Sequence, residues 1–139
     1  MDEHFERAEG ADGWIAARNG DEWHVLGSRC RSCARLAAPA DRFGCLQCGA
    51  PTEQVDFLPL SGRGTLLNAV TVFQPLIADA TVPLVIGRIA LEEGPVVSAQ
   101  IGVEEEQLSP GMALQAEMVG ASASAAGAWR FNPAEEARA

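Results

Sequence analysis

Four cysteines are the residues of this 139-residue chain whose type and spacing most clearly indicate chemistry. They form two Cys-x-x-Cys pairs, Cys30/Cys33 and Cys45/Cys48, separated by residues 34–44. Two residues between cysteines allow a tight turn to direct both sulfur atoms at one point, so two such turns supply four thiolates for a tetrahedral zinc ion. Gly49 follows the second pair, where a positive φ would relieve the turn. Four thiolates also leave no open position for a catalytic water. We therefore expect one structural Zn²⁺ that stabilises the fold.

Two other uses of the cysteines are weighed against zinc. A pair of disulfides suits a secreted protein, but the chain opens Met-Asp-Glu-His and has no apolar leader-like run. A redox Cys-x-x-Cys normally lies between a strand and a helix, whereas Gly27 and Pro39 bracket the first pair with turn residues. His24 is a conceivable extra ligand. Because zinc ribbons close at four ligands, we expect His24 to be a surface or packing residue.

The composition limits the class of partner. The formal net charge is −9, the pI is about 4.6, and every basic residue other than histidine is an arginine. A net negative surface is repelled by phosphate backbones, which disfavours general nucleic-acid binding. The sequence has no apolar run of about 18 residues, so we expect no membrane span and a cytoplasmic protein.

The elements that position the cysteines are predicted to be strands. Residues 1–22 carry Phe5 and Trp14 among glycines and acidic residues, and are expected to form an N-terminal helical or extended segment with short helical turns, or a frayed terminus. Residues 23–59 are predicted to form a rubredoxin-like zinc ribbon, with strands over 23–29, 35–39 and 52–60.

The rest of the chain has the composition of strands throughout. Residues 60–133 predict a bent strand over 65–73, a hairpin turning at 92–94, a helical turn at 104–108, and two further strands. Five strands in this order match a small barrel of the OB type, although periodicity alone supports only a small barrel or sandwich. Residues 134–139 are expected to be a solvated tail. The predicted fold class is thus mostly β.

This order of parts resembles the zinc-ribbon plus OB-fold acyl-CoA-associated proteins, known as domain of unknown function 35. The motifs that carry the resemblance are residues 26–33, Cys45/Cys48, 60–66, 83–88, 91–95 and 108–112. The sequence departs from the family at Ala34, where glycine is usual, and at Gly44, where proline or an aromatic residue is frequent.

The resemblance implies a non-catalytic accessory subunit of a thiolase-family enzyme, required for the partner's folding or activity and for holding or channelling an acyl-CoA. An enoyl-CoA hydratase or a lipid-transfer-type aldolase is the alternative partner. The residue types are consistent with a non-catalytic role, since the sequence shows no pairing typical of a nucleophile and its general base. A nucleic-acid-binding ribbon/OB module and an enzyme with an unrecognised carboxylate site are the remaining alternatives.

Two arginines of the second block are candidate contacts to CoA or to the partner. Arg63 lies in a glycine-flanked turn, where backbone can approach a ligand and the guanidinium can bind phosphate with two donors. An exposed turn arginine, paired with a nearby carboxylate, is the competing interpretation. Arg88 lies within a predicted strand, so a buried or interfacial pair competes with ligand contact.

Two further groups are candidate partner contacts. Arg29 and Arg31 lie beside the first cysteine pair, where they could meet an anionic partner or stabilise the thiolate-rich site itself. Leu76 and Ile77 lie in a predicted loop over 74–81, and two large aliphatic residues in a surface loop suggest a docking element.

Overall fold

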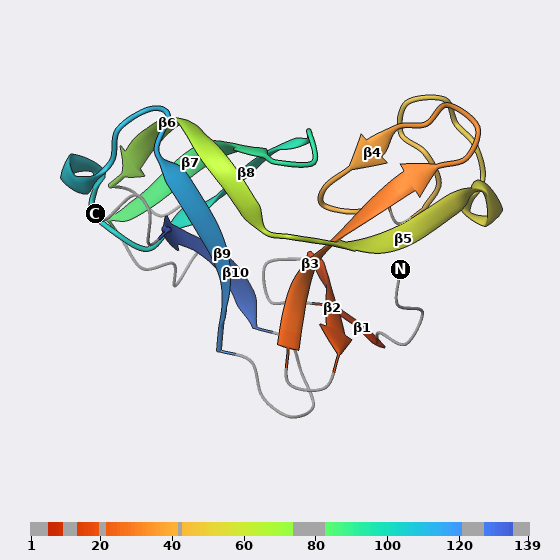
Figure 1. Ribbon diagram of the computed structural model, residues 1–139, viewed down its shortest axis with the longest axis horizontal. Helices are drawn as coiled ribbons and strands as arrows, with labels where there is room; N and C mark the ends of the chain where they lie inside the picture. The colour runs from red at the N-terminus through yellow and green to blue at the C-terminus, as the bar shows by residue number, and fades with distance from the viewer. Residues whose placement is uncertain are drawn as a thin grey trace.

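The computed structural model consists of two β-sheets joined end to end. It describes residues 6–9, 14–19, 22–41, 43–73, 83–120 and 127–134. Figure 1 shows the ribbon with β3, β4 and β5 at one end and the barrel at the other. The elements are β1 (Glu6–Glu9), β2 (Ile15–Asn19), β3 (Glu22–Cys30), β4 (Leu36–Ala37), η1 (Thr52–Gln54), β5 (Val55–Leu60), β6 (Arg63–Val72), β7 (Leu84–Leu91), β8 (Val96–Ile101), η2 (Glu105–Gln107), β9 (Ala113–Val119) and β10 (Ala128–Pro133).

The ribbon is built around the nine-residue strand β3. Its first half pairs with β2, and its second half pairs with the short strand β4. Strand β5 pairs antiparallel with β3 from Val25↔Leu60 to Cys30↔Val55. The return strand predicted at 35–39 and the strand leading into the barrel are therefore confirmed. These pairings place Cys30 at the end of the long central strand.

The short helical turns expected in residues 1–22 are wrong for the described part of that segment. β1 and β2 form an antiparallel pair that extends the ribbon sheet. Ala16 and Ala17 in β2 are fully buried, Ala16 in the main core and Ala17 beside Leu26. Pairing with β3 and burial on both faces of the sheet outweigh the weak helical preference of a glycine-interrupted segment.

The second block is a closed barrel with the strand order β10-β8-β7-β6-β9. β10 closes it by pairing parallel to β8 and antiparallel to β9. The predicted bend in the first barrel strand is confirmed, because β6 shifts register between Leu66 and Asn68. The predicted 92–94 turn is confirmed too, with Gly94 at φ +122°. The helical turn is the 3-10 helix η2.

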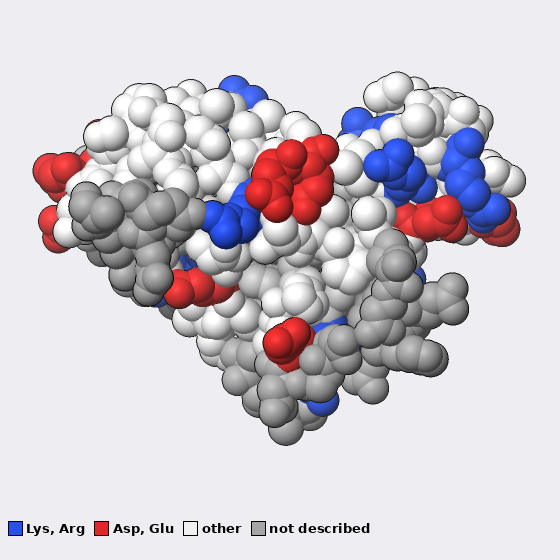
Figure 2. All heavy atoms as spheres, viewed as in Figure 1, with Lys and Arg blue, Asp and Glu red and all other residues white. Residues whose placement is uncertain are grey.

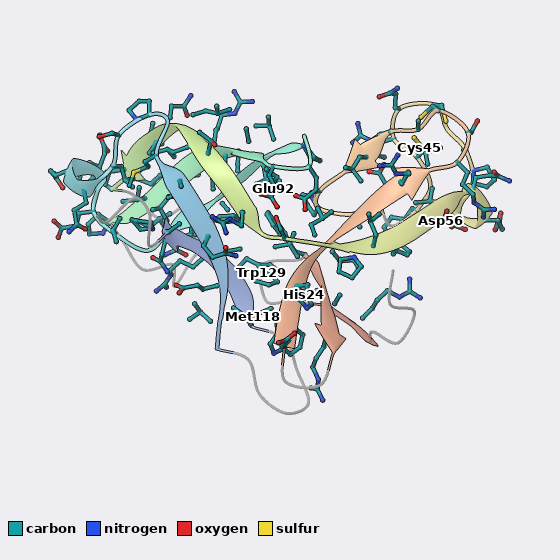
Figure 3. All side chains as sticks on the ribbon, in the orientation of Figure 1. His24, Cys45, Asp56, Glu92, Met118 and Trp129 are labelled. Atoms are coloured by element: carbon teal, nitrogen blue, oxygen red, sulfur yellow. The ribbon has the colours of Figure 1, made fainter. Side chains whose placement is uncertain are left out.

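One hydrophobic core joins the barrel to the ribbon sheet. The barrel residues Trp129 and Phe131 belong to the same buried cluster as Ala16 of β2 and Val25 of β3. Figure 3 labels Trp129 and Met118 on the barrel strands and His24 on β3. Shared burial of this kind holds the two sheets in one relative orientation, since separating them exposes apolar surface at about 25 cal/mol per Å².

The N-terminal segment and the C-terminal tail are each less separate from the rest of the fold than the sequence predicts. The ribbon sheet includes β1 and β2, so the expected separate N-terminal segment is part of it. Ala134 of the predicted tail is buried, and its N–H donates to the carbonyl of Ala113 at 3.0 Å. Among the described residues, no helix is long and apolar enough to cross a membrane.

Candidate metal centre

The two cysteine turns have the same backbone hydrogen bonds. In the first, the N–H of Ala34 donates to Cys30 O at 2.9 Å and the N–H of Cys30 donates to Arg35 O at 2.9 Å. In the second, the N–H of Gly49 donates to Cys45 O at 3.0 Å and that of Cys45 donates to Ala50 O at 2.9 Å. The two turns are therefore repeats of one Cys-x-x-Cys turn, which we call a knuckle.

Both knuckles need a left-handed residue directly after the second cysteine. Gly49 has φ +79°, as the sequence predicts, and Ala34 has φ +67° at the equivalent position. Ala34 is the one non-glycine residue with positive φ in the described ranges. The first knuckle thus takes the full knuckle geometry at a cost in strain, because an L-residue there is about 1–2 kcal/mol less favourable than glycine.

Gly44, directly before the second cysteine pair, also has a backbone conformation that requires glycine. Gly44 has φ +110°, and a Cβ built on it would lie 2.7 Å from the backbone carbonyl oxygen of Ala50. That carbonyl accepts the Cys45 N–H, so it cannot move without disturbing the knuckle. Glycine at this position is therefore required by the local fold, whatever residue other chains carry.

The four sulfur atoms converge on one point. All four are free thiols within 4.8 Å of one another, with Cys30 and Cys45 buried and Cys48 exposed. The Cys30 and Cys48 sulfurs lie 3.7 Å apart, and those of Cys33 and Cys45 lie 3.6 Å apart. Zn–S bonds of about 2.3 Å in a tetrahedron require S···S edges of about 3.8 Å. The cluster therefore fits a tetrahedral zinc ion.

The thiols of the cluster differ in acidity. Backbone N–H groups, above all that of Cys48, lower the pKa of Cys45 to about 7 despite burial. For Cys33 the backbone hydrogen bond at Arg35 acts to lower the pKa, but burial and hydrogen bonds with the other cysteines raise it to about 12. Since zinc binds thiolates, loading the site must displace the protons that these sulfurs share.

A buried aspartate that was not singled out in the sequence, Asp41, links the two knuckles. The side chain of Arg35 donates to Asp41 at 3.0 Å, and the N–H of Leu46 in the second knuckle donates to the same oxygen at 3.4 Å. The Asp41 N–H donates to the hydroxyl of Ser28 at 2.8 Å. The one feature of the sequence that could have pointed to Asp41 is that it is the single acidic residue of residues 34–44, which also contain two arginines.

The candidate arginines beside the first pair lie at the surface. Arg29 is exposed on β3. Arg31 forms an ion pair with Asp56 at 3.4 Å and donates to the carbonyl oxygen of Glu53. Figure 2 shows basic side chains at the ribbon end of the molecule, with acidic side chains beside them. The charge of Arg31 is thus partly neutralised, and the role of Arg29 and Arg31 as partner contacts stays a prediction.

The barrel candidates lie apart from the metal centre. Arg63 is exposed at the start of β6, and its N–H donates to the Ser61 hydroxyl at 3.1 Å. Gly62, at φ +75°, packs against the barrel, and a Cβ on Gly64 would lie 2.8 Å from Ala90 O. The two glycines therefore have a role in the fold that needs no ligand. Arg88 is exposed on β7, and its role as a ligand or partner contact stays a prediction.

Three side chains singled out in the sequence remain, namely Leu76, Ile77 and His24. Leu76 and Ile77 lie outside the described residues. His24 is half-buried, 3.7 Å from Glu22, and belongs to no ligand cluster that the described residues form.

Two exposed apolar side chains lie at the second knuckle, Phe43 just before Cys45 and Leu46 directly after it. Phe43 is 88% exposed and Leu46 is 80% exposed, the two highest values among the large hydrophobic residues described. We call these two residues the ribbon tip. Neither residue was predicted from the sequence, because each is a single large apolar residue that belongs to no apolar run.

Comparison with known proteins supports the architecture. Residues 58–119 match the family model for the C-terminal OB-fold domain of ChsH2. The structure described as an Ltp2-ChsH2(DUF35) aldolase is similar at a TM-score of 0.62 and 21% identity, over 79% of this chain and 84% of that chain. A DUF35-family protein of unknown function from Sulfolobus solfataricus gives a TM-score of 0.49 at 16% identity, over 80% of this chain and 76% of that one.

Proposed function

We propose that this chain, whose residues 58–119 match the family model of the ChsH2 OB-fold domain, is a DUF35-type protein that acts as a zinc-binding, non-catalytic accessory subunit of an acyl-CoA-processing enzyme complex. The observation that carries the proposal is the ribbon tip. Phe43 and Leu46 are held in solvent by a metal knuckle on a sheet that shares its core with the barrel. A rigid, exposed pair of large apolar residues has the character of an interface anchor.

The proposed zinc is structural. Its ligands would be Cys30, Cys33, Cys45 and Cys48, whose sulfur separations match a closed tetrahedral site. A bound zinc ion would fix both knuckles, and the Arg35–Asp41–Leu46 contacts would hold one knuckle against the other. In this proposal the metal acts on the function by positioning the ribbon tip.

The partner we propose is a thiolase-family enzyme. An aldolase of the lipid-transfer type is the second candidate, and the similar fold found in a structure named as an Ltp2-ChsH2 aldolase favours it. In either complex the reaction takes place in the partner. This chain would hold or channel the acyl-CoA, with Arg63 and Arg88 as proposed contacts on the barrel and Arg29 and Arg31 on the ribbon.

Co-expression tests the proposal. The chain would be produced with the thiolase-family enzyme encoded nearest to it, and the mixture separated by size exclusion. Co-elution of the two proteins, and loss of co-elution in a Phe43→Asp/Leu46→Asp variant, is the expected result. Val119→Asp, on an exposed valine of β9, is the matched control. A complex that withstands the double variant would refute the role of the ribbon tip.

A further inference from the structure

A groove runs along the barrel at the η2 end, away from the metal centre. Its volume is about 770 Å³, and its apolar lining includes Phe73, Leu84 and Val103. Phe73 is 72% exposed, and Leu84 and Val103 are half-buried. Figure 1 shows η2 at the end of the molecule farthest from the ribbon, so this groove and the ribbon tip are separate surfaces.

The charges that line the groove are mostly negative. Glu104, Glu105 and Glu106 are all exposed on it, and Glu105 accepts a hydrogen bond from the Thr71 hydroxyl. Figure 2 shows acidic side chains at this end of the barrel. Phosphate groups would be repelled here, which disfavours both nucleic acid and the phosphates of a CoA ester as occupants.

One hydrogen-bond donor at the groove has no acceptor among the described residues. Arg130 lines it from β10, and its Nε is buried with no hydrogen-bond partner among the described residues. None of the ion pairs found in the described part of the chain involves Arg130, although three glutamates line the same groove. A buried unpaired N–H costs about 1–3 kcal/mol. A carbonyl oxygen from an incoming chain would satisfy it once the half-buried side chain of Arg130 turned toward the groove on binding.

We propose that this groove binds a segment of the partner enzyme in which lysine or arginine residues alternate with large apolar side chains. The apolar residues would pack on Phe73, Leu84 and Val103, the basic residues would face Glu104 and Glu106, and a backbone carbonyl would accept from Arg130. The inference rests on the proposed function, because the accessory-subunit role supplies the occupant. It adds a second, electrostatically selective contact to the apolar one at the ribbon tip.

The first test uses the chain alone with a defined probe. A fluorescein-labelled peptide of alternating arginine and leucine is titrated with the zinc-loaded chain, and anisotropy is recorded. An otherwise identical glutamate–leucine peptide is the probe control. We expect binding of the basic peptide only, weakening as salt is raised. Equal binding of both peptides, or binding of neither, overturns the proposal.

Variants locate the contact. Glu104→Lys and Phe73→Ser should each weaken binding of the basic peptide roughly tenfold. Glu22→Lys, an exposed glutamate on the ribbon sheet, is the matched charge control and should leave the affinity unchanged apart from the small effect of net charge. An equal loss in Glu22→Lys would mean that overall charge, and not the groove, attracts the peptide, which refutes the site.

The second test uses the complex with the enzyme. The same groove variants should dissociate it at lower salt than wild type, whereas Glu22→Lys should not. If wild type forms no complex, the proposed function fails, and the peptide titration still decides whether the groove has the stated selectivity. If the complex forms and the groove variants bind as tightly as wild type, the further inference fails while the proposed function stands.

Discussion

Replacing Ala34 by glycine should stabilise the zinc-loaded protein. Ala34 has φ +67° in the first knuckle, where an L-residue costs about 1–2 kcal/mol. Glycine removes that strain but gives the unfolded chain more freedom, which is worth about 0.4–1 kcal/mol in the opposite direction. Ala34 is exposed, so little burial is lost. The net expectation is a gain of about 0.5–1 kcal/mol in the free energy of unfolding.

Gly49 offers the reciprocal experiment. It occupies the equivalent position in the second knuckle with φ +79°, and a Cβ placed there would meet no atom within 4 Å. Gly49→Ala therefore tests the backbone conformation without a steric clash. It should lower the free energy of unfolding by about as much as Ala34→Gly raises it. The double variant Ala34→Gly/Gly49→Ala should return close to the stability of wild type, because the two knuckles make the same hydrogen bonds.

Urea unfolding at a fixed free-zinc concentration measures these differences, since zinc binding contributes to the apparent stability and must be held constant. The midpoint should move with an unchanged slope. Destabilisation by Ala34→Gly of the size of Gly49→Ala would refute the reasoning, because it would mean that position 34 has an ordinary backbone conformation.

Four further predictions concern the metal, the linker and the barrel. Cys48→Ala should abolish stoichiometric zinc in elemental analysis and leave the ribbon unfolded in circular dichroism, whereas full zinc content would contradict a four-cysteine site. Because protons compete with zinc for thiolates, zinc affinity should fall as the pH is lowered from 7, and a chelator titration that gives a pH-independent affinity would exclude thiolate ligands. Glu93 accepts the Ser61 N–H at 2.9 Å in the ribbon–barrel linker, so Glu93→Ala should lower stability by about 1–2 kcal/mol in thermal unfolding and Glu93→Gln by less. Gly64→Ala should lower stability by about 1–3 kcal/mol in the same assay, because the added Cβ would lie 2.8 Å from the carbonyl oxygen of Ala90. An unchanged melting temperature would show that the two strands can move apart at this position.

The features that the sequence predicts well are those with local causes. A Cys-x-x-Cys turn needs only its own residues and the one that follows, which is why Gly49 was assigned its conformation correctly. The hairpin that turns at Gly94 is likewise set by a glycine between two apolar runs. The bend of β6 and the barrel order follow from strand spacing combined with a family resemblance.

The features that were missed depend on contacts between distant residues. β2 is a strand because Ala16 meets Val25 across the sheet and joins the barrel core, which no property of residues 1–22 reveals. Asp41 is held in place by Ser28, which lies 13 residues earlier in the chain and accepts the Asp41 N–H. The groove at η2 combines segments that lie up to about sixty residues apart, so its charge pattern is invisible until the barrel closes.

Native mass spectrometry of the tagged chain, purified after co-expression with the thiolase-family enzyme encoded nearest to it, would show whether the two proteins form a zinc-loaded complex. We expect a heteromeric assembly that contains both proteins, with one zinc ion for each copy of this chain, and no acyl-CoA turnover by this chain when it is isolated. A zinc-free chain observed only by itself, or one that converts acyl-CoA without the enzyme, would refute the proposed accessory role.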